Sequence, residues 1–116
     1  MRKLSAEMQE CAERCQTCAT TCFNMAMNHC LEAGGKHTEP DHFRLMMACA
    51  EICKASAAVL LTGIREHVYV CRACAEICRA CATSCEKVGD MQECVTACRA
   101  CAETCDKMSA NLQKAA

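Results

Sequence analysis

Cysteine is the residue type with the clearest chemical pattern in this chain. Sixteen of its 116 residues are cysteine, and most recur at alternating spacings of four and three residues. Four series follow this rhythm: Cys11, Cys15, Cys18 and Cys22; Cys49 and Cys53; Cys71, Cys74, Cys78, Cys81 and Cys85; and Cys94, Cys98, Cys101 and Cys105. Because an α-helix completes a turn every ~3.6 residues, each series stays on one helical face. The spacing predicts helices that line a metal-binding interior with thiols.

The spacing of four residues also suggests how a metal would be held. Residues four apart on a helix have Cβ atoms ~5–6 Å apart, so two thiolates of one helix can reach the same ion. Seven C-x3-C pairs offer this: Cys11/Cys15, Cys18/Cys22, Cys49/Cys53, Cys74/Cys78, Cys81/Cys85, Cys94/Cys98 and Cys101/Cys105. Such pairs suit a soft monovalent ion, Cu(I). Two helices could still give Zn(II) four thiolates, so the ligand type alone leaves both metals open.

Charge balance favours copper. Four zinc ions bound by sixteen thiolates would leave eight unbalanced negative charges in the interior, whereas sixteen Cu(I) ions would balance them fully. Without metal, adjacent thiolates would repel, so the thiols should stay protonated and loading should release about one proton per cysteine. Unshared pairs would hold about half as many ions as there are cysteines, and bridging thiolates would approach one each. We therefore expect a store of several Cu(I) ions per chain.

Glycine, proline and capping residues divide the chain into four helices. We expect helices at 5–31, 40–62, 65–88 and 91–113, with Ser5 as an N-cap and Pro40 in a first turn. Gly34-Gly35, Gly63 and Gly89-Asp90 separate them. Short connections make neighbouring helices antiparallel, so the fold class is all-α, an up-down-up-down four-helix bundle. A length of 116 residues suits one domain, residues 1–116.

The residues beyond the cysteine series differ between the two ends of such a bundle. One set forms an aliphatic end: Leu4, Met8, Leu60, Ile64, Val68, Met108 and Leu112. The other, the entrance cluster, offers soft metal ligands: His29, Cys30, His42, Met46 and Met91. His37, in a loop, is expected to be solvated, and His67 to be a satisfied histidine rather than a ligand. Ser56 stands where the helix expected at 40–62 would place a third thiol, and it is expected to fill space.

Composition excludes several classes of function. The net charge of −1 and the three aromatic residues give no basic stripe or stacking platform, so no nucleic-acid partner is expected. No run approaches ~20 apolar residues, so no membrane span is expected. The first residues lack the apolar core of a signal peptide, which favours the reducing cytosol. Nothing suggests an enzyme, since no catalytic triad, phosphate loop or carboxylate pair is present.

Other interpretations remain open beside a copper store. Disulfides between helices could use the same cysteines, although thiols three and four apart on one helix are poorly directed for mutual bonding. A metal or redox sensor would need a partner-binding surface, which the sequence does not show. An iron–sulfur protein would need four thiols that converge at one place.

The chain resembles the bacterial copper storage proteins, which are four-helix bundles with cysteine-lined cores. The resemblance covers essentially the whole chain, through CAERCQTCATTC, CRACAEICRACATSC and CVTACRACAETC. It implies uptake of several Cu(I) ions through pairs such as Cys74/Cys78, a homotetramer, and an entrance bearing Met and His, here Met46 and His42. It also implies a cytoplasmic location for a member without a leader and, as partners, copper ions and unidentified copper-accepting proteins.

Overall fold

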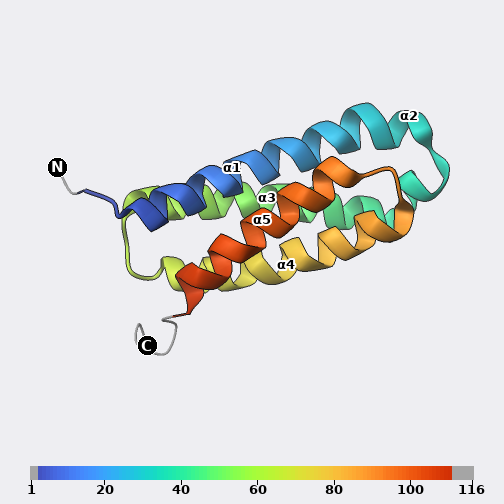
Figure 1. Ribbon diagram of the computed structural model, residues 1–116. Coiled ribbons are helices and arrows are strands. Elements are labelled where there is room, and N and C mark those ends of the chain that lie inside the picture. Colours follow the sequence, from blue (N-terminus) through green and yellow to red (C-terminus); the bar gives the residue numbers. More distant parts are fainter. Residues whose placement is uncertain (1–2, 111–116) are drawn as a thin grey trace.

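The computed structural model describes residues 3–110, which form an antiparallel bundle of four long helices (Figure 1). The elements in chain order are α1 (Ala6–Met25), the π-helix η1 (Ala26–Cys30), α2 (Leu31–Ala33), the 3-10 helix η2 (Gly35–Thr38), α3 (Pro40–Thr62), α4 (His67–Val88) and α5 (Gln92–Ser109). Helix α1 packs against α3 and α5, and α4 packs against the same two helices. The up-down-up-down bundle predicted from the sequence is confirmed.

Local capping explains where the helices begin and end. The Ser5 hydroxyl accepts a hydrogen bond from the Met8 backbone N–H at 3.1 Å, as predicted for an N-cap. The predicted bounds of α3, Pro40 and Thr62, are also confirmed, and Gly63 ends it with a left-handed φ of 78°. Helix α4 begins at His67 rather than Arg65, because a turn occupies the residues between. The predicted end of the last helix, Gln113, lies outside the described residues.

The sequence led us to expect one regular helix over residues 5–31, but the first helix is not regular throughout. Its last turns form the π-helix Ala26–Cys30, which carries both Ala26 and Cys30 into the core at 0% exposure. In a continuous α-helix, Cys30 would lie about 80° around the axis from Cys22. The wider π turn rotates less per residue and so keeps Cys30 on the core side. The irregular turn therefore adds one thiol at the end of the bundle.

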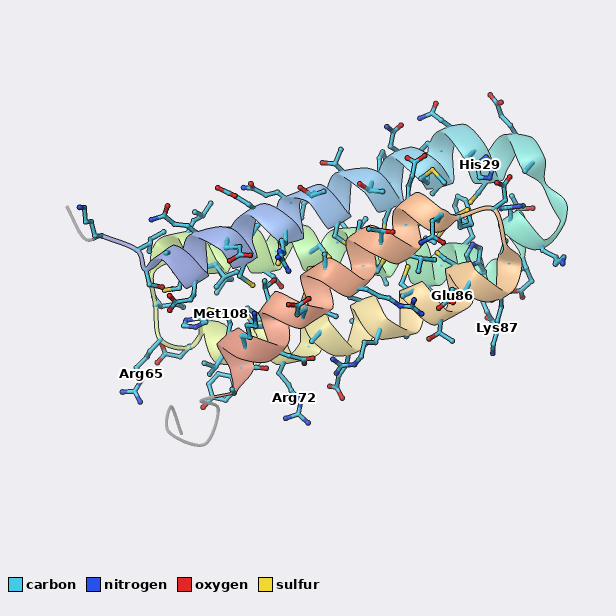
Figure 2. All side chains as sticks on the ribbon, in the orientation of Figure 1. His29, Arg65, Arg72, Glu86, Lys87 and Met108 are labelled. Atoms are coloured by element: carbon cyan, nitrogen blue, oxygen red, sulfur yellow. The ribbon has the colours of Figure 1, made fainter. Side chains whose placement is uncertain are left out.

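The aliphatic end is only partly as predicted. Leu60 and Val68 are buried, and Met8 and Met108 pack half-buried against the core. Leu4 is half-buried, and Leu112 lies outside the described residues. The expectation was wrong for Ile64, which is 43% exposed because it lies in the turn before α4. Figure 2 places Met108 at this end and His29 at the opposite end.

Helix α3 is long and apolar enough to cross a membrane by length and composition, with a mean hydropathy of 1.6 in its best window. The helix meets this criterion through its mean hydropathy, while Asp41, Arg44, Glu51 and Lys54 interrupt its apolar residues, so the expected absence of a run of ~20 apolar residues stands for this helix. In the bundle, α3 packs against α1 and α4 and buries Cys49, Cys53 and Leu60 in the core. Alanine, leucine and cysteine make this helix apolar, and they are also the residues that fill the bundle interior.

Candidate metal centre

The four long helices direct their cysteine series toward one another. All sixteen cysteines are 0% exposed, and all are free thiols. The fifteen that belong to the four series form a thiol column along the bundle axis, and Cys30 lies beyond them. The nearest of the described sulfur pairs joins Cys53 to Cys78 at 3.4 Å, which is contact without a bond. The interpretation that these cysteines form disulfides between helices was therefore wrong.

Sulfur contacts between helices are as short as those within one helix. Two of the seven C-x3-C pairs, Cys18/Cys22 and Cys74/Cys78, have their sulfurs 3.9 Å apart. Between α1 and α5, the sulfurs of Cys15 and Cys101 are 3.5 Å apart. A cysteine in this column thus has sulfur neighbours on other helices that are as close as its partner four residues along the same helix.

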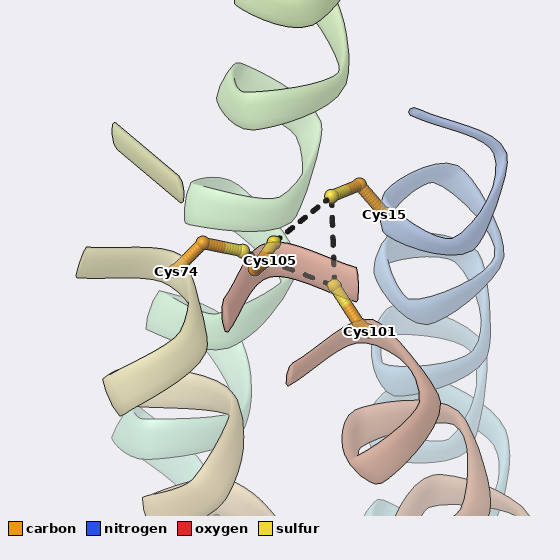
Figure 3. A group of neighbouring side chains, drawn as sticks. All are labelled: Cys15, Cys74, Cys101 and Cys105. Carbon is orange, nitrogen blue, oxygen red and sulfur yellow. Dashed lines mark hydrogen bonds between the residues drawn. The ribbon is translucent and has the colours of Figure 1, made fainter. Parts of the chain in front are cut away.

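Within residues 3–110, the thiols converge in four groups of four and one of three. In each group, all sulfur atoms lie within 4.8 Å of one another. The groups are Cys15/Cys74/Cys101/Cys105, Cys53/Cys74/Cys78/Cys101, Cys18/Cys49/Cys53/Cys78, Cys18/Cys22/Cys49/Cys98 and Cys11/Cys71/Cys105. Figure 3 shows the first of them, with sulfurs from α1, α4 and α5 pointing into one space. Several cysteines belong to two groups, so one thiolate can serve two ions.

Sulfur ligands of a second kind surround Cys30. Its Sγ lies 3.7 Å from the Sδ atoms of both Met46 and Met91, which are almost fully buried. The Nδ1 atom of His37 approaches the same Sγ to 4.0 Å. A thiol, two thioethers and an imidazole make a set of soft donors suited to a single monovalent ion.

The entrance cluster also holds an oriented imidazole. The Nδ1 atom of His42 lies 2.7 Å from the hydroxyl oxygen of Ser84, while its buried Nε2 has no hydrogen-bond partner. In the tautomer with the proton on Nδ1, the ring donates to Ser84 and leaves the Nε2 lone pair free. A hydrogen bond on one ring nitrogen that leaves the other available is the usual arrangement of a metal-binding histidine.

Hydrogen bonding and burial shift the pKa values of two thiols near this end of the bundle in opposite directions. Hydrogen bonds from Cys81 and Cys94 lower the pKa of the Cys85 thiol to about 4. Burial, assisted by the negative charge of Cys85, raises the pKa of the Cys30 thiol. These shifts favour the thiolate form at Cys85 and the protonated thiol at Cys30.

Two further histidines, His29 and His37, lie next to each other. His29 is half-buried, and its Nε2 lies 3.7 Å from an Asp90 carboxylate oxygen. His37, expected to be solvated, is half-buried, and its ring meets that of His29 edge-on with centroids 4.9 Å apart. The sequence offered one signal for the contact between His37 and Cys30: the two residues are seven apart, with Gly34-Gly35 between them.

The other two predicted sites have simpler environments. The Nδ1 atom of His67 lies 2.7 Å from the backbone carbonyl oxygen of Ile64, so this ring is satisfied locally, as expected. Ser56 is fully buried, and its hydroxyl has no hydrogen-bond partner. Ser84 was missed because only its contact with a different helix distinguishes it from other serines.

Comparisons with known proteins agree with this geometry. The sequence model of the copper storage protein family matches residues 4–110. The crystal structure of the Nmul_A1745 protein from Nitrosospira multiformis is similar with a TM-score of 0.87 and 59% identity, covering 90% of this chain and 95% of that one.

A second solved structure, the Cu(I)-bound copper storage protein BsCsp3, is similar with a TM-score of 0.81 and 34% identity. The similarity covers 89% of this chain and 98% of that one. None of the curated proteins compared has a significantly matching sequence. From its thiol column, its fold and its match over residues 4–110, we conclude that the chain belongs to the copper storage protein family.

Proposed function

We propose that this protein binds and stores several Cu(I) ions through the cysteines of its core. The observation that carries the proposal is the chain of overlapping four-thiol groups in a fully buried column. Sixteen soft ligands without a solvent-exposed member are suited to holding many ions, whereas a carrier that hands over one ion needs an accessible site. The Cu(I)-bound relative with 34% identity supports copper as the cargo.

Shared thiolates solve the charge problem of a filled core. Each Cu(I) brings one positive charge and each bound cysteine one negative charge, so a filling with about one ion per cysteine is neutral. Cys53 and Cys78 belong to two four-thiol groups each, as bridging requires. The thiols lose their protons to solvent as the metal enters, and the neutral filling avoids the cost of buried net charge.

The entrance cluster is proposed as the route by which copper enters and leaves. Its ligands are His29, Cys30, His42, Met46 and Met91, and His37 joins them in the structure. Thioethers and imidazoles bind Cu(I) less firmly than thiolates do, so they can pass an ion inward without trapping it. Cys85, with its lowered pKa, is the first acceptor behind them.

The remaining features of the proposal follow from the same assignment. The chain acts as one storage domain, residues 1–116, without catalytic activity, and sequesters copper in the cytosol, where thiols stay reduced. Delivery to copper-accepting proteins would occur through the entrance cluster. A homotetramer is proposed on the family resemblance, and no nucleic acid or membrane is needed for storage.

Metal analysis of protein from copper-fed cells tests the proposal. The protein is produced in cells grown with and without added copper, purified without oxygen, and analysed by native mass spectrometry. We expect several copper ions per chain from copper-fed cells and a large decrease in a variant with serine at Cys18, Cys53, Cys74 and Cys101. Protein that leaves copper-fed cells with at most one copper ion would refute storage.

A further inference from the structure

We propose that the copper-free core also binds divalent d10 cations, Zn(II) or Cd(II), and that it holds two of them per chain. The sites use cysteines of the proposed copper store, but the inference rests on the positions of the sulfur atoms and not on copper binding. Its basis is that the four-thiol groups have tetrahedral dimensions and overlap in a pattern that fixes the number of ions.

The dimensions of two groups match a tetrahedral site. A Zn–S bond of about 2.3 Å implies edges of about 3.8 Å between the four sulfurs. In the group Cys53/Cys74/Cys78/Cys101, five of the six edges measure 3.8, 3.4, 3.8, 3.9 and 3.9 Å. In the group Cys18/Cys22/Cys49/Cys98, four edges measure 3.9, 3.7, 3.6 and 3.9 Å. Little movement is therefore needed to enclose a tetrahedral ion.

The overlap of the groups is regular along the column. The group at Cys15 shares Cys74 and Cys101 with the group at Cys53/Cys74. That group shares Cys53 and Cys78 with the next, which in turn shares Cys18 and Cys49 with the last. Neighbouring groups thus have two sulfurs, one whole edge, in common, and groups further apart have none. At most two of the four-thiol groups can be filled at once without sharing a thiolate.

Sharing an edge costs more for two divalent ions than for two Cu(I) ions. Two tetrahedral ions on either side of a common sulfur edge would be about 2.7 Å apart. The repulsion between two doubly charged ions is four times that between two Cu(I) ions at the same distance. The repulsion thus favours bridged filling for Cu(I), whereas Zn(II) and Cd(II) should fill separate groups. In residues 3–110, the remaining group, Cys11/Cys71/Cys105, has only three sulfurs.

Net charge sets the order of preference between the metals. A divalent ion with four thiolates carries a net charge of −2, so two filled sites leave four negative charges in a dry core. The copper filling is neutral and should displace the divalent ions. The protein would then hold Zn(II) or Cd(II) when copper is scarce and release them as copper enters.

Titration of the apo protein with Cd(II) under anaerobic conditions tests the stoichiometry. Thiolate-to-metal charge transfer in the ultraviolet and native mass spectrometry should both reach a plateau at two ions per chain. Zn(II) should compete for the same two sites, and added Cu(I) should expel both metals. A plateau at none, one, or three or more ions would overturn the inference without affecting the copper titration.

Two serine substitutions give a matched comparison. Cys53 and Cys74 are both fully buried, their sulfurs are 3.8 Å apart, and each belongs to two four-thiol groups. After Cys74→Ser, the two surviving groups share Cys18 and Cys49, so the Cd(II) plateau should fall to one. After Cys53→Ser, the groups Cys15/Cys74/Cys101/Cys105 and Cys18/Cys22/Cys49/Cys98 survive without overlap, so the plateau should stay at two.

A second pair of variants protects the comparison against misfolding. Cys101→Ser should behave as Cys74→Ser does, and Cys78→Ser as Cys53→Ser does, because they remove the same groups. Copper capacity should decrease equally in all four, since Cu(I) does not require separate groups. If folded Cys53→Ser and Cys74→Ser gave equal Cd(II) plateaus, or if folded Cys78→Ser and Cys101→Ser did, the proposed sites would be contradicted.

Discussion

The imidazole of His42 and the hydroxyl of Ser84, on α3 and α4, are joined by a hydrogen bond of 2.7 Å. The bond fixes a buried ring whose other nitrogen has no hydrogen-bond partner. Cys85 follows Ser84 on α4, and hydrogen bonds from Cys81 and Cys94 lower its pKa to about 4. On the proposed entry route, Ser84 would hold the His42 ring in position for copper transfer.

Replacement of Ser84 by alanine should slow copper uptake without changing capacity. Loss of a hydrogen bond that orients a metal-binding histidine typically weakens the site by about 10-fold or more. We expect Ser84→Ala to take up Cu(I) from a chelator complex about 10-fold more slowly. Ser84→Thr should restore the rate, and Thr83→Ala, at an exposed neighbour, should leave it unchanged. An unchanged rate in Ser84→Ala would contradict this role.

The two thioethers near Cys30 should act on rate as well. Met46→Leu and Met91→Leu keep the volume of the side chain but remove its sulfur. Both substitutions should slow uptake and release severalfold in stopped-flow measurements, with a loss of at most about one ion from the total. Met108→Leu is the matched control at the opposite end of the bundle. If this control slows transfer as much, copper does not enter through the entrance cluster.

The sequence predicts the bundle well, because the periodicity of cysteine reports directly which helix face is buried. Pro40 and Gly63 likewise mark the ends of α3 through their own backbone constraints. The π-helix was not predictable, since it depends on a shift of backbone hydrogen bonds that leaves the residue pattern unchanged.

Features that depend on contacts between distant segments could not be predicted from the sequence either. The return of His37 toward Cys30 depends on the chain direction after Gly34, whose φ is 65°. The contact between His42 and Ser84 depends on the register of two helices. The C-x3-C spacing showed the pairs within a helix but not the equally short sulfur contacts between helices.

Ser56 interrupts the sulfur lining of α3 and should be replaceable in two informative ways. Its buried hydroxyl has no partner, so Ser56→Ala should raise the free energy of unfolding of the apo protein by about 1 kcal/mol, measured by urea denaturation. Ser109→Ala should lower it, because that hydroxyl donates to the Asp106 carbonyl at 3.2 Å. Ser56→Cys should add about one copper ion to the capacity. Destabilisation by Ser56→Ala would show that the hydroxyl is bonded.

The raised pKa of Cys30 predicts how apo stability changes with pH. The folded state keeps this thiol protonated above its ordinary pKa of 9.0, where the unfolded chain loses the proton. The unfolded state then binds fewer protons, so this contribution to stability is complete below pH 9.0 and is lost as pH rises through the folded pKa.

Melting temperatures of the apo protein and of Cys30→Ala measure this contribution. As the pH rises above 9.0, the melting temperature of the apo protein should fall by more than that of Cys30→Ala. Copper-loaded protein, which has already lost the proton, should show a smaller decrease. Identical pH profiles for the apo protein and the variant would contradict the assignment.

Titration of the apo protein with Cu(I) against a high-affinity chelator, without oxygen, tests the central claim most directly. Shared thiolates in the column predict tight binding of more than about eight ions per chain, which unshared pairs of sixteen cysteines cannot provide. About one proton should be released for each cysteine engaged. A plateau at one or two ions, with most thiols still reactive toward a thiol reagent in the unfolded protein, would contradict storage in the core.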